Sequence, residues 1–157
     1  MLPETELLLY SAARAQHVAL IRQWLAAGVV VISDRYADAT RAYQGAARGL
    51  DAADVDAAER LATGGLVPDL TLLFDLPVEE GQMRRRQAKP GGGEWNRLDA
   101  ENLDFHGRVR QAYLAMARLE PSRWVVLDAS LPPDELESEI WEIVKKRLPT
   151  LPDSRPS

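Results

Sequence analysis

An acid and a base follow each other at the end of an apolar run in Val29–Tyr36, which reads VVVISDRY. Its β-branched residues predict a strand over 29–33 that is buried on both faces. Because buried parallel strands present ligand-binding groups at their carboxyl ends, Asp34 and Arg35 would face a cleft. An arginine fork there suits a phosphate, and an aspartate beside it suits a metal–water cluster. From the local sequence, a structural ion pair between the two residues is an equal alternative.

Two other parts of the chain carry arginines that could bind phosphate. Arg14 lies one helical turn after Tyr10, where it belongs either to a solvated face or to a cleft. Arg84–Arg86 precedes the glycine run 91–93, and Arg97 follows it. These arginines either cover a solvated helix face or belong to a closing lid. Phosphoryl transfer uses a charged lid, since it depends on positioning, cationic stabilisation and exclusion of water.

The composition excludes several classes of protein. A length of 157 residues predicts one domain over 1–148, followed by a flexible tail over 149–157 that is rich in proline, serine and charge. The net charge of −5 argues against a general nucleic-acid-binding face. The lack of cysteine excludes disulfides, thiol catalysis and Cys-ligated zinc. With no membrane-length apolar run and no signal-peptide pattern, we expect a cytoplasmic location without membrane contact.

Helical patterns alternate with apolar runs along the chain. The predicted helices cover 4–27, 37–48, 51–63, a segment from Pro77, 99–119 and a segment from Pro132. The predicted strands cover 29–33, 70–75 and 124–128. This alternation predicts an α/β fold with a parallel sheet.

The 4–27 helix carries a stripe of small apolar residues suited to pairing across a two-fold axis, so we expect a homodimer through it.

The common phosphate-binding and nucleophile motifs do not occur in these residues. No glycine is followed by lysine, so a Gly-x-x-x-x-Gly-Lys-Ser/Thr loop is not present. There is no Gly-x-Gly-x-x-Gly fingerprint and no serine nucleophile elbow. A pair of glycosidase carboxylates is not excluded, but nothing in the sequence favours one.

Five segments resemble, in the same order, segments of bacterial thymidylate kinases, which are P-loop kinases. They are Glu6–His17, Asp34–Gly45, Thr63–Thr71, Arg97–Asp99 and Leu127–Ser130, within a resemblance that runs from Pro3 to Val144. It implies a P-loop-kinase-like parallel sheet flanked by helices, and ATP-dependent phosphorylation of dTMP to dTDP with Mg²⁺. It also implies that the first strand, phosphate loop, first helix and second strand of that fold are absent from these residues. We therefore expect an incomplete sheet and a chain that is inactive by itself.

The resemblance implies an acceptor site for dTMP. Tyr10 would stack on thymine, and Tyr43 would line the sugar and exclude a ribose hydroxyl. Arg14 and Arg35 would hold the monophosphate, and Asp34 would act near it and, through water, near the magnesium. Two polar residues would contact the base: Thr40 and Gln44.

The resemblance also implies a donor site for ATP. Arg84, Arg86 and Arg97 would supply positive charge to the ATP phosphates and the transition state, while Ala129 and Ser130 would border adenine. No general base is required, since the attacking oxygen belongs to an anionic phosphate.

Two local departures from the family pattern accompany the absent phosphate loop. Ala39 stands where the family commonly has serine, and the segment 89–95 makes the lid longer and richer in glycine. The competing interpretation is a non-catalytic remnant that binds dTMP or serves as a dimerisation scaffold. A kinase for another nucleoside monophosphate is a third option, against which Tyr43 and Gln44 argue.

Overall fold

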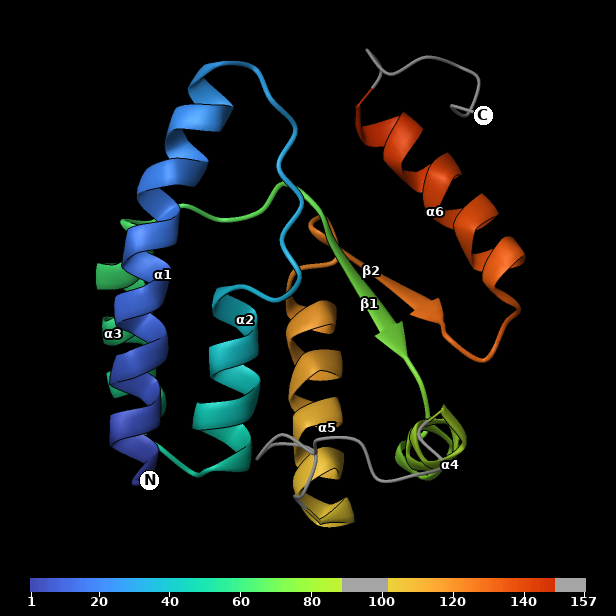
Figure 1. The fold of residues 1–157 in the computed structure, drawn as a ribbon, viewed down its shortest axis with the longest axis horizontal. Coiled ribbons are helices and arrows are strands. Elements are labelled where there is room, and N and C mark those ends of the chain that lie inside the picture. The colour runs from blue at the N-terminus through green and yellow to red at the C-terminus, as the bar shows by residue number, and fades with distance from the viewer. Residues whose placement is uncertain (89–101, 149–157) are drawn as a thin grey trace.

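The computed structural model describes residues 1–88 and 102–148, as helices around a pair of strands (Figure 1). Its elements are α1 (Pro3–Ala26), α2 (Ala37–Thr40), η1 (Arg41–Ala47), α3 (Ala52–Thr63), β1 (Thr71–Asp75), α4 (Val78–Ala88), α5 (Leu103–Leu119), β2 (Trp124–Asp128) and α6 (Pro133–Arg147). Strands β1 and β2 run parallel, with Thr71 opposite Trp124 and Asp75 opposite Asp128. The predicted α/β class with parallel pairing is therefore confirmed for these two strands.

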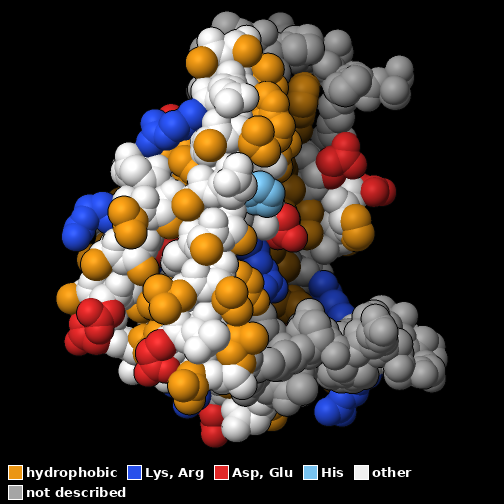
Figure 2. Space-filling model, turned by 60° about the vertical axis from the view of Figure 1, so that its left-hand side comes forward, with side chains coloured by type: hydrophobic (Ala, Val, Ile, Leu, Met, Phe, Trp, Pro, Cys, Tyr) orange, Lys and Arg blue, Asp and Glu red, His pale blue; other side chains and the backbone are white. Residues whose placement is uncertain are grey.

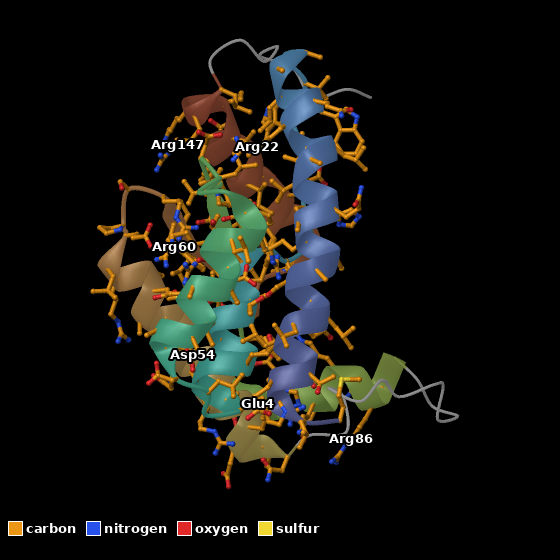
Figure 3. The ribbon with its side chains drawn as sticks, turned by 90° about the vertical axis from the view of Figure 1, so that its left-hand side faces the viewer. Glu4, Arg22, Asp54, Arg60, Arg86 and Arg147 are labelled. Atoms are coloured by element: carbon orange, nitrogen blue, oxygen red, sulfur yellow. The ribbon has the colours of Figure 1, made fainter. Side chains whose placement is uncertain are left out.

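Helix α1 extends along one side of the molecule, next to α3 (Figure 3). Pro3 occupies its first turn, where a missing N–H costs nothing, and Glu4 and Glu6 complement the positive end of the helix dipole. Near the other end of α1, the Arg22 guanidinium donates to the carbonyl oxygens of Thr63 and Gly64, at 3.1 and 2.9 Å. These bonds attach α1 to the last turn of α3, and the predicted helix over 4–27 is confirmed to within one residue.

The predicted buried strand over 29–33 is wrong for the described structure. This segment leads from α1 to α2 without strand pairing (Figure 1). Val29, Val30 and Ile32 are 50%, 57% and 93% exposed. A strand exists only where a neighbour pairs with its backbone, and the sheet in the described ranges consists of β1 and β2 alone. Within residues 1–88 and 102–148, the apolar run therefore has no ladder partner, and most of its side chains are not covered.

The predicted helical segment over 37–48 is confirmed to within one residue, but it divides into a short α-helix and a π-helix. The four residues of α2 are followed by η1, in which the hydrogen bonds are wider than α-helical. The Arg48 N–H, for example, donates to the Tyr43 carbonyl five residues earlier, at 2.9 Å. Single-turn π-helical segments are rare and occur frequently at functional sites. Two candidate substrate residues, Tyr43 and Gln44, lie in this element.

The apolar core lies between η1 and α5. Ala42 and Ala47 of η1 pack against Phe105 and Val109 of α5, and all four are buried. The Tyr43 and Phe105 rings meet edge to face, with their centroids 6.1 Å apart. This contact fixes Tyr43 against the helix that also packs on β2.

Helix α5 begins later than the predicted helix over 99–119. The Asn102 side chain accepts a hydrogen bond from the Phe105 N–H at 2.9 Å, as an N-cap residue does. The glycine-rich lid, Arg97 and the tail over 149–157 lie outside the described residues. In the described ranges, no helix has both the length and the apolar character needed to cross a membrane.

Candidate functional site

The turn that follows the 29–33 segment holds Arg35 in an unusual backbone conformation. The φ angle of Arg35 is +67°, in the left-handed region, which costs a residue with a side chain about 1 kcal/mol. The Ser33 hydroxyl donates to the Arg35 carbonyl oxygen at 2.9 Å and closes this turn. The Arg35 guanidinium then lies 5.0 Å from the centre of the Tyr43 ring. Strain of this kind is typical of residues that are held in place for a ligand.

The local sequence allows a structural ion pair between Asp34 and Arg35 as the alternative to a phosphate site. Both residues are exposed, and neither forms an ion pair with the other or with another carboxylate or base in the described part of the chain. The Arg35 charge is therefore available to an anion, which favours the phosphate interpretation.

A cavity of about 270 Å³ opens at the carboxyl end of β1, where parallel strands present ligand-binding groups. Its walls come from η1, from β1 and the turn after it, and from α4 and α5. The lining residues are Tyr43, Leu73, Phe74, Asp75, Leu76, Pro77, Val78, Gly81, Gln82, His106, Val109, Arg110 and Tyr113. Because Arg35 lies over Tyr43, its guanidinium stands at the border of this cavity.

Tyr113 forms a neutral wall of the cavity. Its burial raises the pKa of the phenol well above the usual value, so the hydroxyl stays protonated at physiological pH. The charges of Asp34 and Arg35 also act on it, in opposite directions. The Tyr113 ring centroid lies 6.5 Å from that of Tyr43. The turn at residues 34–35 and the two tyrosines therefore belong to one site.

An ion pair fixes the strand end that borders the cavity. The Arg110 guanidinium donates twice to the Asp75 carboxylate, with N–O distances of 2.6 and 2.8 Å. These hydrogen bonds hold the pKa of Asp75 below its usual value. The sequence showed an acid at the end of this strand, but not its partner 35 residues later, because no local spacing connects them.

Arg14 is neither on a solvated face nor free in a cleft. Its side chain is 13% exposed, and its Nε lies 2.8 Å from a carboxylate oxygen of Glu59 on α3. Its Nη2 donates to the hydroxyl of Thr40 at 2.7 Å, and its guanidinium lies 5.3 Å from the centre of the Tyr36 ring. The structure thus brings the predicted site residues Arg14 and Thr40 together, around an acid that the sequence analysis did not select.

Glu59 could have been found from the helical pattern of α3. Val55, Glu59 and Ala62 share one face of the helix, and all three are buried. An acid between two apolar positions on a core-facing stripe needs a partner. The partner itself could not be identified from the spacing, because Arg14 lies in another helix.

Two other residues that are predicted to contact the base, Gln44 and Tyr10, are not part of the cluster around Arg14. The Gln44 amide nitrogen donates to a Glu6 carboxylate oxygen at 2.7 Å, and the residue is 2% exposed. Tyr10 is 45% exposed on α1, one turn before Arg14. Contacts of Tyr10, Thr40 and Gln44 with a base therefore stay predictions.

The predicted ATP-side residues Arg84, Ala129 and Ser130 are brought together. Arg84 donates to the carbonyl oxygen of Ala129 at 2.7 Å and to that of Ser130 at 3.3 Å. It also pairs with Glu80 one turn earlier in α4. These contacts attach α4 to the loop after β2. Arg86 is exposed on α4 (Figure 3), and Arg97 lies outside the described residues.

The described residues could hold a magnesium ion only indirectly, through water molecules. No group of three potential metal-ligating side chains is found in the described ranges. Asp34 contributes one exposed carboxylate near the Arg35 turn. Such a site suits Mg²⁺ that is held mainly by phosphate oxygens and water, which is how the ion is usually bound with nucleotides.

Comparison with known proteins adds an independent observation. The family model described as thymidylate kinase matches residues 1–140. The thymidylate kinase of Thermomicrobium roseum is 52% identical over 143 residues, which cover 90% of this chain and 67% of that protein. The thymidylate kinase of Nitratidesulfovibrio vulgaris is 49% identical over 152 residues, covering 94% and 71%. That of Roseiflexus castenholzii is 44% identical over 162 residues, covering 97% and 71%. Every candidate site residue lies within the range that the family model matches.

Proposed function

Because the chain belongs to the thymidylate kinase family, we propose that it serves the ATP-dependent phosphorylation of dTMP to dTDP and forms the acceptor side of the site. The observation that carries this proposal is the placement of Arg35, strained and without an acidic partner in the described ranges, over Tyr43 at the border of a cavity. A fixed guanidinium beside an aromatic wall suits a nucleoside monophosphate.

The chemistry on the acceptor side is mainly positioning and charge stabilisation. A phosphate oxygen of dTMP attacks the γ-phosphorus of ATP, and ADP leaves with the bridging oxygen. Since the attacking oxygen is already anionic, no side chain has to remove a proton. Arg35 offsets the charge of the monophosphate, so that the donor phosphate can approach it. Tyr43 lies against the sugar and leaves no room for a ribose 2′-hydroxyl.

The base is proposed to lie toward α1. Tyr10 stacks on thymine, while Arg14, one turn later on the same helix, holds the monophosphate together with Arg35. Thr40 and Gln44 border the base from α2 and η1. The hydrogen bond between Arg14 and Thr40 supports this grouping, because it places two of the four side chains in one contact.

The donor side is proposed to form where α4 meets the loop after β2. Arg84, Arg86 and Arg97 supply positive charge to the phosphates of ATP, and Ala129 and Ser130 border adenine. The hydrogen bonds from Arg84 to both of the latter residues support the grouping. Mg²⁺, when bound, shields the phosphate charges, and Asp34 orients a water of its hydration shell.

We propose that the 157-residue polypeptide has little kinase activity by itself. Its sequence contains no Gly-x-x-x-x-Gly-Lys-Ser/Thr loop, which in P-loop kinases binds the ATP phosphates. The exposed residues Val29, Val30 and Ile32 support the inference that a further strand, beside β1 and the 29–33 segment, completes the working site.

A coupled assay of dTMP-dependent ADP release tests this proposal. The 157-residue protein is expected to show no release above background, while the T. roseum thymidylate kinase serves as the positive control. Turnover by the 157-residue protein in the range of about 1–100 s⁻¹, which is ordinary for kinases, would contradict it.

The second candidate function is a non-catalytic dTMP-binding protein or a dimerisation scaffold. Helix α1 favours the scaffold, because large apolar side chains remain exposed along it, including Leu9, Leu20 and Trp24 at 56%, 41% and 48%. Hydrophobic side chains are prominent on this side of the molecule (Figure 2). We propose that this face forms a homodimer in either case. A dTMP-binding measurement distinguishes the dTMP-binding protein from the scaffold, since a pure scaffold binds no nucleotide.

A further inference from the structure

We propose that Glu59 is a positioning residue that orients Arg14 for the nucleotide. The inference rests on the proposed function, in which Arg14 contacts dTMP. Glu59 lies on α3, faces α1 and is 1% exposed. Its carboxylate is thus one of the most deeply buried charged groups in the described structure. The side chains that contact it show which residue it holds in place.

The Glu59 carboxylate contacts two residues of α1. Its Oε1 accepts a hydrogen bond from the buried Ser11 hydroxyl at 3.2 Å. Its Oε2 lies 2.8 Å from Arg14 Nε, but the N–H does not point along that line, so the contact is ionic and not an aligned hydrogen bond. Arg14 Nη2 is taken by Thr40 at 2.7 Å. Side chains from α1, α2 and α3 therefore meet at one guanidinium.

This arrangement fixes the orientation of Arg14 and leaves one nitrogen for a ligand. Within the described part of the chain, Nη1 donates no hydrogen bond. A guanidinium that is held at its other two nitrogens loses little freedom when the third meets a ligand. A purely structural role would require only that the buried charge of Glu59 be compensated. The additional hydrogen bond to Thr40 fixes the plane of the guanidinium, which charge compensation alone does not require, and therefore points to positioning.

Calorimetric titration with dTMP tests the inference on four proteins: the wild type, R14Q, E59Q and the double variant. We expect E59Q to weaken dTMP binding about tenfold, the order of effect of losing one charged partner. R14Q should weaken it at least as much, and the double variant should bind as R14Q does, because Glu59 acts through Arg14. The control is D56N, which removes an exposed carboxylate from the same helix and should bind as the wild type does.

The outcomes separate the inference from the function on which it rests. If R14Q weakens binding and E59Q does not, Glu59 does not position Arg14, although the proposed function stands. Additive effects in the double variant would overturn the inference in the same way. If R14Q binds as the wild type does, both the inference and the proposed role of Arg14 are wrong. If the wild type binds no dTMP, the proposed function fails as well.

A second measurement needs no change at Glu59, which matters because breaking a buried ion pair can unfold a protein. In the ¹⁵N spectrum of the wild type, the Arg14 Nε–H signal, assigned with R14K, should be resolved and protected from exchange with water. It should shift when dTMP is added. A rapidly exchanging signal, or one that dTMP leaves unchanged, would overturn the inference.

Discussion

Arg35 combines two properties that substitutions can separate: a left-handed backbone and a guanidinium over the Tyr43 ring. R35A removes the side chain and keeps the strain, whereas R35G removes both, because glycine adopts positive φ freely. We expect both variants to lose dTMP affinity equally. R35G should have the higher free energy of unfolding, by about 1 kcal/mol. Calorimetry and urea unfolding measure the two quantities.

The matched control for these variants is R60A, which removes an exposed arginine on α3. It should change neither dTMP affinity nor stability. If R35A retained wild-type affinity, Arg35 would not be a phosphate ligand, and if R35G were no more stable than R35A, the backbone would not be strained.

The ion pair between Asp75 and Arg110 predicts a pH dependence of stability. Hydrogen bonds from Arg110 lower the pKa of Asp75 in the folded protein, while in the unfolded chain it is about 3.9. The stabilisation is therefore fully present above the unfolded pKa and is lost as the pH falls through the folded pKa. D75N should lower the free energy of unfolding by about 1 kcal/mol at pH 7, and by less as the pH falls below about 4.

Urea unfolding of wild type and D75N over this pH range checks the prediction. The control is D69N, which removes an exposed carboxylate just before β1 and should show no such trend. A D75N effect that stayed constant down to low pH would show that packing, and not the ion pair, is responsible.

The single residues of the site differ in how well the sequence identified them. Asp34 and Arg35 could be selected because an apolar run ends at them, and this pattern is local. The Glu59 partner of Arg14 is 45 positions away, and the Arg110 partner of Asp75 is 35 positions away. Such pairs are created by the packing of separate elements, which no spacing along one element records.

At the scale of elements, the contact between η1 and α5 carries Tyr43. Phe105 is 3% exposed, meets the Tyr43 ring edge to face and lies under the Arg48 guanidinium. We expect F105L to lower the free energy of unfolding by about 2 kcal/mol, since it loses volume and aromatic contacts together. Because Tyr43 loses a support, dTMP affinity should also decrease.

Thermal and urea unfolding, with dTMP calorimetry, measure the effect of F105L. L103A provides the control, because Leu103 is 46% exposed on the same helix and should change stability and affinity little. A loss of stability in F105L without any loss of affinity would show that η1 does not depend on α5 to hold Tyr43.

The elements that the sequence predicted well are those whose signals are local. Helix α1 has a proline and two acids in its first turn, and β2 is a short apolar run before an acid. The 29–33 run has an equally clear strand pattern, but pairing requires a neighbour that the described ranges do not contain. The division into α2 and η1 could not be predicted either, because the residue pattern of so short a segment does not distinguish π-helical from α-helical hydrogen bonds.

At the scale of the whole molecule, the exposed face of α1 predicts a dimer. Leu9 and Leu20 lie on one stripe of the helix, 11 residues apart, and both are exposed. Light scattering should give twice the mass of the 17.4 kDa chain for the wild type. The L9E/L20E variant should give the monomer mass, because four charges would meet at a symmetric interface.

The control for this variant is L61E, which adds a charge at an 87% exposed position on α3. It should leave the oligomeric state unchanged. A wild-type protein that is monomeric at the concentrations used for calorimetry would exclude this dimer.

We propose that these 157 residues bind the acceptor nucleotide but not the donor. Calorimetric titration of the 157-residue protein with dTMP, and separately with ATP and Mg²⁺, measures the two affinities. We predict saturable binding of dTMP that R35A removes, and no saturable binding of ATP, because the sequence carries no phosphate loop. Saturable binding of ATP, or no binding of dTMP, would show that this division of the site is wrong.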